Sequence, residues 1–140
     1  MKNSSNFSGG SIRGVIIKNN KILLVKEKTE GIWETPGGKI EKNEKDPIKI
    51  CKREVLEETG FLVSPLNTLD FVIDYIPKTN IRRFHLIYKC IPYGKRRKIS
   101  EKNIEGINWF SKNEIKKMLK KKSYDHHDKN ILKMFVRGKL

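Results

Sequence analysis

Cysteine is scarce in this chain of 140 residues. Its two cysteines, Cys51 and Cys90, lie far apart, in segments with the patterns of a helix and of a strand. Two such residues are too few for a disulfide scaffold, and their spacing is not that of a zinc site. We therefore expect both to be reduced side chains that fill the core.

Long apolar runs are also missing from the sequence. None approaches the roughly 20 residues that cross a bilayer, and the first ten residues, MKNSSNFSGG, lack the apolar centre of a signal peptide. These absences argue against a membrane protein and favour a cytoplasmic one. We interpret residues 1–10 as a flexible arm and residues 11–140 as a single domain, which is long enough to bury its own core.

Acidic residues are few, with 16 Asp and Glu against 31 Lys and Arg, so the formal net charge is +15. Such an excess attracts anions and speeds their encounter with the protein. Nucleic acids, nucleotides and phosphates are candidate partners. A solvated surface rich in lysine through compositional drift explains the same number, so charge alone does not identify a function.

Strand patterns outnumber helix patterns along the chain. Strands are predicted at Ile12–Lys18, Lys21–Lys26, Phe61–Val63, Leu69–Ile76, Arg82–Ile91 and Ile107–Phe110. Helices are predicted from Pro47 to Thr59, from Lys112 onward behind a Ser111 cap, and over Asp125–Val136. Pro36-Gly37-Gly38 suggests a turn or bulge, and Tyr93–Lys102 suggests a basic, mobile loop. The order of elements predicts an α/β domain with a mixed sheet covered by helices.

Three carboxylates dominate the helix predicted after Asp46. Glu54, Glu57 and Glu58 have i, i+3 and i+4 spacing, so they project from one face. Clustered oxygen ligands suit Mg²⁺, and Arg53 is placed to hold Glu57 in position. The adjacent Gly37-Gly38 pair would let the backbone approach a ligand closely, where a carbonyl supplies another oxygen. The alternative is a solvated acidic helix face.

The segment that contains these residues resembles the Nudix box, G-x5-E-x7-R-E-U-x-E-E-x-G-U. The matching positions are Gly38, Glu44, Arg53, Glu54, Val55, Glu57, Glu58, Gly60 and Phe61. Eight residues rather than seven separate Glu44 from Arg53, and we place the extra residue near Lys45-Asp46, before the helix. This departure leaves the role of Glu44 open.

The resemblance implies a Nudix fold, a mixed β-sheet sandwiched between α-helices. It implies that Glu54, Glu57 and Glu58 bind Mg²⁺, for which Mn²⁺ substitutes, that the Gly37 carbonyl is an additional ligand, and that Arg53 orients the cluster. The reaction it implies is attack of water on a diphosphate bridge, assisted by metal and by a general base. Our first candidate for that base is Glu105, the second is Glu101, and Glu54 is the alternative inside the box.

Substrate contacts are harder to predict. Lys39, Arg13 and Arg83 are candidate phosphate ligands, with Lys26 and Arg82 further strand cations, and Tyr75 is a candidate stacking face, as are Phe84, Tyr88 and Trp109. Core packing or a solvated strand face is the alternative for each. His85, His126 and His127 have no spacing typical of a metal site, so we expect structural or surface roles.

The favoured function is hydrolysis of a nucleoside triphosphate, normal or oxidised, to a monophosphate and pyrophosphate. ADP-ribose, dinucleotides and RNA 5′ ends are alternative substrates, the last because Gly94–Lys98 is a basic run. A non-catalytic nucleic-acid-binding protein on the same scaffold is the alternative from another class. The sequence does not distinguish a monomer from a homodimer.

Overall fold

The computed structural model describes residues 6–140, in which the strands are β1 (Asn6–Val15), β2 (Ile17–Lys18), β3 (Lys21–Glu27), β4 (Trp33–Glu34), β5 (Gly37–Lys39), β6 (Leu62–Ile76), β7 (Ile81–Tyr93) and β8 (Ile104–Phe110). The helices of this range are α1 (Pro47–Thr59), α2 (Lys112–Lys121), the short 3₁₀ helix η1 (His126–Asp128) and α3 (Lys129–Val136). None of these helices has both the length and the apolar character that a membrane crossing requires.

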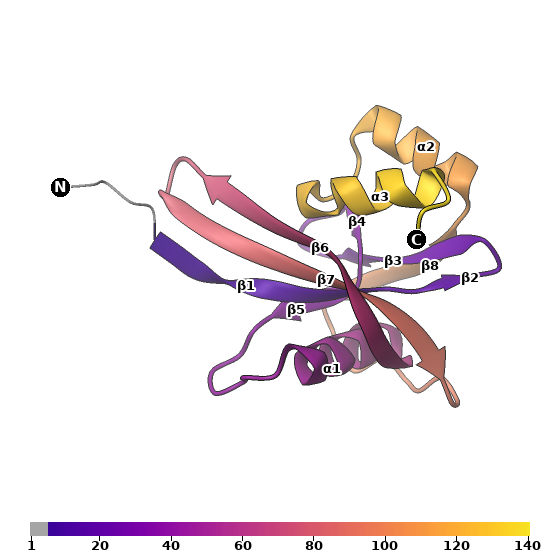
Figure 1. Cartoon of the computed structure of the whole chain (residues 1–140), viewed down its shortest axis with the longest axis horizontal. Coiled ribbons are helices and arrows are strands. Elements are labelled where there is room, and N and C mark those ends of the chain that lie inside the picture. The colour runs from indigo at the N-terminus through magenta and orange to yellow at the C-terminus, as the bar shows by residue number, and fades with distance from the viewer. Residues whose placement is uncertain (1–5) are drawn as a thin grey trace.

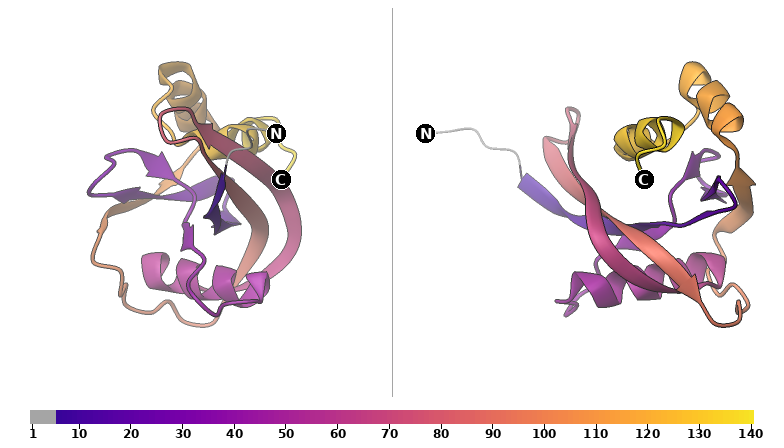
Figure 2. Two further views of the ribbon diagram at one scale, coloured as in Figure 1. Left: turned by 90° about the vertical axis from the view of Figure 1, so that its left-hand side faces the viewer. Right: turned by 45° about the vertical axis from the view of Figure 1, so that its right-hand side comes forward.

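Two four-stranded sheets form the centre of the molecule. The first has the order β5-β1-β7-β6, and the second contains β2, β3 and β4, with β8 paired to β3. β1 and β7 are parallel whereas β5 and β6 are antiparallel to their neighbours, so the first sheet is mixed. α1 lies on one side of the strands and α2 and α3 lie on the other (Figures 1 and 2). The predicted mixed sheet between helices is confirmed.

The buried apolar side chains form two clusters, one with α1 and one with α2 and α3. β3 supplies both: Leu23 enters the α1 cluster, while Ile22 and Leu24 enter the other, as the two-residue period of a strand requires. Cys51 and Cys90 are free and buried in the α1 cluster, with their Sγ atoms 3.6 Å apart. Both therefore fill the core, as the sequence predicts.

Local sequence signals define both ends of α1. Asp46 Oδ1 accepts a hydrogen bond from the Ile48 N–H at 2.9 Å, and Pro47 occupies the first helical position. Gly60 ends the helix with a φ of 79°, a left-handed conformation that favours glycine. These ends set the register of the helix, so its glutamates fall on one face as their spacing predicts.

The segment between β7 and β8 packs against the C-terminal end of α1. Arg96 Nε donates a hydrogen bond to the Thr59 carbonyl at 2.9 Å, and the Arg96 guanidinium lies 4.8 Å from the centre of the Phe61 ring. A cation at this end of a helix stabilises carbonyl groups that have no partner within the helix. The loop predicted over Tyr93–Lys102 is confirmed except that Tyr93 belongs to β7, and part of it contacts the end of α1.

We expect Gly60→Ala to destabilise the fold more than Gly31→Ala. Both glycines have positive φ, 79° and 67°, and alanine in that conformation costs about 1–2 kcal/mol. A Cβ on Gly60 would also collide with the Arg97 carbonyl oxygen, whereas one on Gly31 meets open space. Urea unfolding of both variants measures the difference. Equal losses of unfolding free energy would show that the Arg97 segment does not pack on Gly60.

Strand β1 begins earlier than the sequence predicts. Residues 6–10, assigned to the flexible arm, belong to β1 and pair with β7 across a bulge. The arm boundary at residue 10 is therefore wrong, and the rest of the predicted arm, residues 1–5, lies outside the described residues. The partner strand is far along the chain, so no local pattern marks this extension.

Two other elements differ in their bounds. The strands predicted at Phe61–Val63 and Leu69–Ile76 are parts of β6, whose pairing with β7 shifts after Pro65 and after Thr68. β6 is the last strand of its sheet, where proline is tolerated because one edge needs no backbone donor. The last predicted helix is divided into η1 and α3.

Candidate functional site

Two of the three clustered glutamates of α1 are buried against β5. Glu58 Oε1 accepts a hydrogen bond from the Gly37 N–H at 2.9 Å. Gly38 lies so close to Glu54 that a Cβ there would collide with the carboxylate. The turn or bulge predicted at Pro36-Gly37-Gly38 is wrong, because Gly37–Lys39 form β5 and pair with β1. The glycines allow helix and strand to approach closely.

Arg53 connects the acidic face of α1 to the segment before the helix. Its Nε and Nη2 donate to the two Glu44 carboxylate oxygens at 2.9 and 2.6 Å. Its Nη1 lies 2.9 Å from Glu54 Oε1 and 3.2 Å from Glu57 Oε2. Despite the extra residue, Glu44 therefore anchors Arg53, and Arg53 holds the pKa of Glu44 below its ordinary value. Arg53 in turn positions Glu54 and Glu57.

Burial changes the acidity of this face. It raises the pKa of Glu54, and it raises the pKa of Glu58 to about 8 although the Gly37 N–H and the Arg13 charge oppose the shift. The charge of Glu27 also disfavours ionisation of Glu58. Carboxylates crowded in this way are relieved by a bound cation, which favours their charged forms.

The metal-free protein is expected to lose stability as pH rises from about 4.5 to 8. Glu58 has an ordinary pKa of 4.5 and a pKa of about 8 in the fold, so in this window the folded chain keeps a proton that the unfolded chain releases. The contribution is complete below the lower value and disappears as pH passes the upper one. Melting temperatures of Glu58→Gln, measured with chelator, should therefore vary less with pH than those of the wild type.

Glu34 does not affect the comparison between the wild type and Glu58→Gln. Burial raises the pKa of Glu34 to about 8 as well, but Glu34 is present in both proteins, so the difference between their curves isolates Glu58. Parallel curves for wild type and Glu58→Gln would contradict a buried, protonated Glu58.

A cavity of about 150 Å³ lies beside β5, lined by Ser11, Arg13, Glu27, Glu30, Glu34, Gly37, Gly38, Lys39, Arg83, His85, Asp125 and His127. Glu27, Glu30 and Glu34 each place a carboxylate oxygen within 4.8 Å of the others. The sequence does not predict this group: the three acids have i, i+3 and i+7 spacing, but their segment forms no helix, and the β3–β4 connection brings them together. A second group of acidic side chains therefore lies near Glu58, on the wall of the cavity.

The three candidate phosphate ligands Lys39, Arg13 and Arg83 line this cavity. Lys39 is exposed and Arg83 is half-buried. Arg13 is 4% exposed and forms an ion pair with Glu34 at 2.8 Å, so much of its charge is already engaged. Tyr75 lies elsewhere: it is 52% exposed, and its hydroxyl donates to Asn80 Oδ1 at 3.1 Å.

The two predicted bases outside the box lie in different settings. Glu105 is exposed on β8, and it is not among the residues that line the cavity. Glu101 is half-buried, and its backbone N–H donates to the Glu57 carbonyl at 3.0 Å. Backbone contact therefore brings Glu101 nearer to the α1 glutamates, while Glu54 is already at the site.

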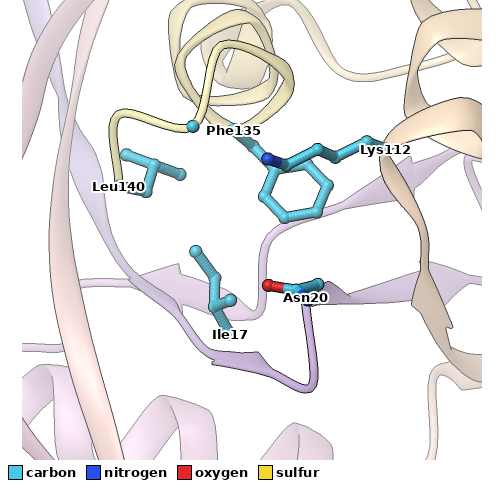
Figure 3. Close-up of a pocket in the computed structure, with 6 residues that line it drawn as sticks. Ile17, Asn20, Lys112, Phe135 and Leu140 are labelled. Atoms are coloured by element: carbon cyan, nitrogen blue, oxygen red, sulfur yellow. The ribbon is translucent and has the colours of Figure 1, made fainter.

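Two other hollows are less suited to this chemistry. One of about 150 Å³ lies between the β2–β3 turn and the C-terminal helices (Figure 3) and is lined by Ile17, Asn20, Lys112, Phe135, Gly138 and Leu140, among which there is no acidic side chain. The other, of about 330 Å³, is lined by Lys18, Asn19, Lys21, Phe61 and Trp109. The two aromatic rings of the latter meet edge to face at 6.0 Å, so it offers aromatic surface beside lysines.

Comparison with known proteins gives a consistent result. Residues 10–135 match the family model described as NUDIX domain. The 8-oxo-dGTP diphosphatase of Buchnera aphidicola subsp. Acyrthosiphon pisum is 31% identical over 75 residues, which are 53% of this chain and 60% of that protein. The m7GpppN-mRNA hydrolase of Saccharomyces cerevisiae is 32% identical over 120 residues, which are 83% of this chain and 12% of that protein.

The chain thus spans less than two thirds of the length of either relative. Among solved structures, the crystal structure of MutT protein from Methanosarcina mazei Go1 superposes with a TM-score of 0.75 at 20% identity, covering 98% of each chain. At that identity the likeness concerns the fold alone.

Proposed function

Because the chain belongs to the Nudix family, as the match over residues 10–135 shows, we propose that it is a pyrophosphohydrolase acting on a nucleoside triphosphate, normal or oxidised. The products would be a nucleoside monophosphate and pyrophosphate. The observation that carries the proposal is the meeting of the α1 glutamates with β5 next to a cavity that contains the cations Lys39 and Arg83.

The residues of the site fit a hard divalent cation, Mg²⁺ or in its place Mn²⁺. Glu54, Glu57 and Glu58 would hold it, with the Gly37 carbonyl as a further oxygen ligand. All of these donors are oxygens, the type that Mg²⁺ prefers, and the raised pKa values of Glu54 and Glu58 show that the bare site disfavours its own negative charge. When bound, the ion neutralises phosphate charge and lowers the pKa of the attacking water.

The other side chains have separate tasks in this proposal. Lys39 and Arg83 bind the phosphates from the cavity wall, and Arg53 positions Glu54 and Glu57. Burial raises the pKa of Glu54, which makes it a stronger base than an ordinary carboxylate. The substrate roles of Arg13 and Tyr75 stay predictions.

Glu105→Gln tests the choice of base. Removing a general base lowers kcat by about 10²- to 10⁴-fold. Because Glu105 is exposed on β8 whereas Glu54 is buried against β5, we expect this variant to retain most of its kcat, and Glu101→Gln is the matched comparison. If Glu105→Gln lowers kcat by about 10²- to 10⁴-fold while its metal affinity is unchanged, the general base is Glu105 instead of Glu54.

The proposal as a whole is tested by product analysis over a panel of nucleotides. The panel holds normal and oxidised triphosphates, ADP-ribose, dinucleotides and 5′-triphosphorylated RNA, each with Mg²⁺, with Mn²⁺ and with chelator. We expect metal-dependent release of a monophosphate from the triphosphates. No turnover of any member, together with steeply salt-dependent nucleic-acid binding, would favour the non-catalytic alternative.

RNA 5′ ends are the second candidate substrate. The similarity to the yeast m7GpppN-mRNA hydrolase extends over 83% of this chain. The hollow at Phe61 and Trp109, flanked by Lys18 and Lys21, offers aromatic stacking and phosphate contacts of the kind that single strands use. Turnover of the RNA member of the panel in preference to free triphosphates would favour this candidate.

A further inference from the structure

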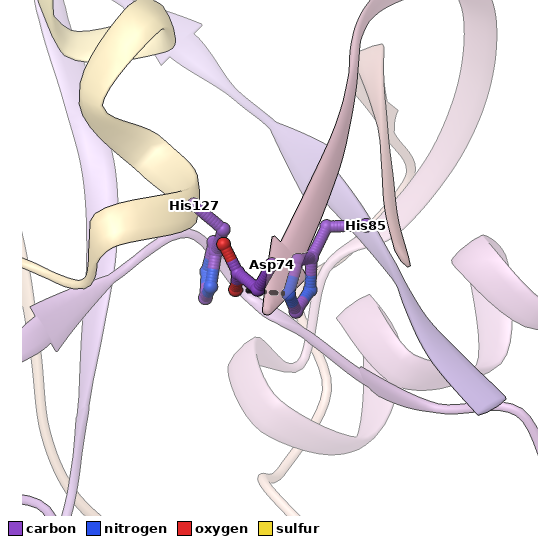
Figure 4. A group of neighbouring side chains, drawn as sticks. All are labelled: Asp74, His85 and His127. Atoms are coloured by element: carbon purple, nitrogen blue, oxygen red, sulfur yellow. Dashed lines mark hydrogen bonds and ion pairs between the residues drawn. The ribbon is translucent and has the colours of Figure 1, made fainter. Parts of the chain in front are cut away.

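Three side chains from distant parts of the chain meet beside the cavity, and two of them, His85 and His127, line it. They are Asp74 on β6, His85 on β7 and His127 on η1 (Figure 4). Asp74 Oδ2 lies 2.7 Å from His85 Nε2, and the two imidazole rings stack with their centres 4.5 Å apart. Each of the three residues places one potential ligand atom within 4.8 Å of the other two.

A separate contact holds each histidine through its Nδ1 atom. His85 Nδ1 lies 2.6 Å from Ser11 Oγ, and His127 Nδ1 lies 2.8 Å from Asp125 Oδ1. When the Nδ1–H of a neutral imidazole donates to an oxygen, its Nε2 carries a lone pair, and histidines that bind metals are typically oriented in this way. The Asp125 contact therefore leaves His127 Nε2 available to a metal, whereas His85 Nε2 is hydrogen-bonded to Asp74 Oδ2 at 2.7 Å, a bond that a metal ion held between the two residues would replace.

His127 Nε2 is a buried polar atom that lacks a hydrogen-bond partner within residues 6–140. The residue is only 4% exposed, and Nε2 lies 3.4 Å from Asp128 Oδ2. A buried nitrogen without a partner costs about 1–3 kcal/mol, so a ligand that satisfies it is favourable. This is a second observation, independent of the clustering, that indicates a missing partner.

We propose that Asp74, His85 Nε2 and His127 Nε2 form a binding site for a divalent transition-metal ion, of which Zn²⁺ fits best. Two imidazoles and one carboxylate are a donor set that selects such ions over Mg²⁺. In a tetrahedral site with bonds of 2.0–2.1 Å, the ligand atoms lie about 3.4 Å apart, so side-chain movements of roughly an ångström would close the site. The fourth position is taken by water.

The site is distinct from the carboxylate cluster on α1 and has its own route for ions. His85 and His127 both line the cavity, so an ion reaches them from there. Asp74 belongs to the last strand of its sheet and His127 to the segment that leads into α3. A bound ion would therefore join β6 and β7 to η1, and it should raise the melting temperature.

Cobalt provides the direct test, because four-coordinate Co²⁺ absorbs strongly in the visible whereas six-coordinate Co²⁺ on carboxylates and water does not. We expect a strong band on adding Co²⁺ to the chelator-treated full-length protein, and its loss when Zn²⁺ displaces the Co²⁺. His127→Gln should weaken Zn²⁺ binding at least tenfold and abolish the Zn²⁺-dependent rise in melting temperature. His126→Gln, an exposed neighbour on η1, is the matched control and should behave as the wild type.

Two further variants keep the test decisive. Asp74→Asn alters a half-buried strand residue with little change of shape, so it weakens the site even if His127→Gln fails to fold. Glu57→Gln should keep the cobalt band, because it affects only the α1 cluster. The proposal is overturned if the wild type gives no strong band, if His127→Gln and Asp74→Asn bind Zn²⁺ as tightly as the wild type, or if Glu57→Gln abolishes the band.

Discussion

Glu57→Gln is expected to lower kcat by roughly 10²- to 10³-fold or more while leaving the fold intact. Removing one preorganised group that stabilises charge in the transition state has an effect of this size. Glu57 is the most accessible of the three α1 glutamates, with its side chain 36% exposed, so it is the one most open to a metal ion from solvent. Glutamine keeps the size of the side chain and removes the charge. Only a part-exposed ion pair with Arg53, at 3.2 Å, is lost from the fold, and such pairs contribute little to stability.

Steady-state kinetics with Mg²⁺, together with a thermal melt of each protein, measures this effect. The matched control is Glu114→Gln, which changes an exposed glutamate in the capping box at the start of α2. Glutamine is also suitable at that position, so this variant should keep wild-type activity. Near-native activity in Glu57→Gln would show that the metal assignment on α1 is wrong.

Gly38→Ala should reduce activity by about 10²-fold with a small effect on stability. The new Cβ would meet the Glu54 carboxylate, the far end of a flexible side chain, which can swing away without disturbing the strand. Displacing a reacting group by about 1 Å is enough to cost about 10²-fold in rate. The variant therefore separates the position of Glu54 from the integrity of the fold.

Gly37→Ala is the informative partner of that variant. There the Cβ would collide with the carbonyl oxygen of Ile12 and lie 2.7 Å from the Arg13 Cα. These are backbone atoms of β1, which cannot yield without breaking the β1–β5 pairing. We expect Gly37→Ala to lower the melting temperature strongly and Gly38→Ala to lower kcat at nearly unchanged melting temperature. The reverse pattern would contradict the placement of β5 against α1.

The parts of the site that the sequence predicts correctly depend on local spacing. Asp46, Pro47 and Gly60 determine where α1 begins and ends, and the helical period then determines which face carries Glu54, Glu57 and Glu58. Each of these inferences needs only residues within a few turns of one another. The extra residue before the helix does not disturb this register, because Glu44 still reaches Arg53 from the irregular segment before Pro47.

The parts that the sequence does not predict depend on strand pairing between distant residues. Arg13 had the pattern of an exposed strand cation, but β1 is an inner strand of its sheet and Arg13 pairs with the buried Glu34. His85 and His127 are 42 positions apart in the sequence, and no short-range pattern relates them. Only the packing of β7 against η1 makes them neighbours.

The central claim is that this chain hydrolyses the phosphoanhydride that separates a nucleoside monophosphate from pyrophosphate. A ³¹P NMR time course of a nucleoside triphosphate with the wild-type protein and Mg²⁺ tests it most directly. We predict that monophosphate and pyrophosphate signals grow together in equal amounts, and that chelator stops both. Release of inorganic phosphate and a nucleoside diphosphate, or turnover that continues in chelator, would contradict the claim.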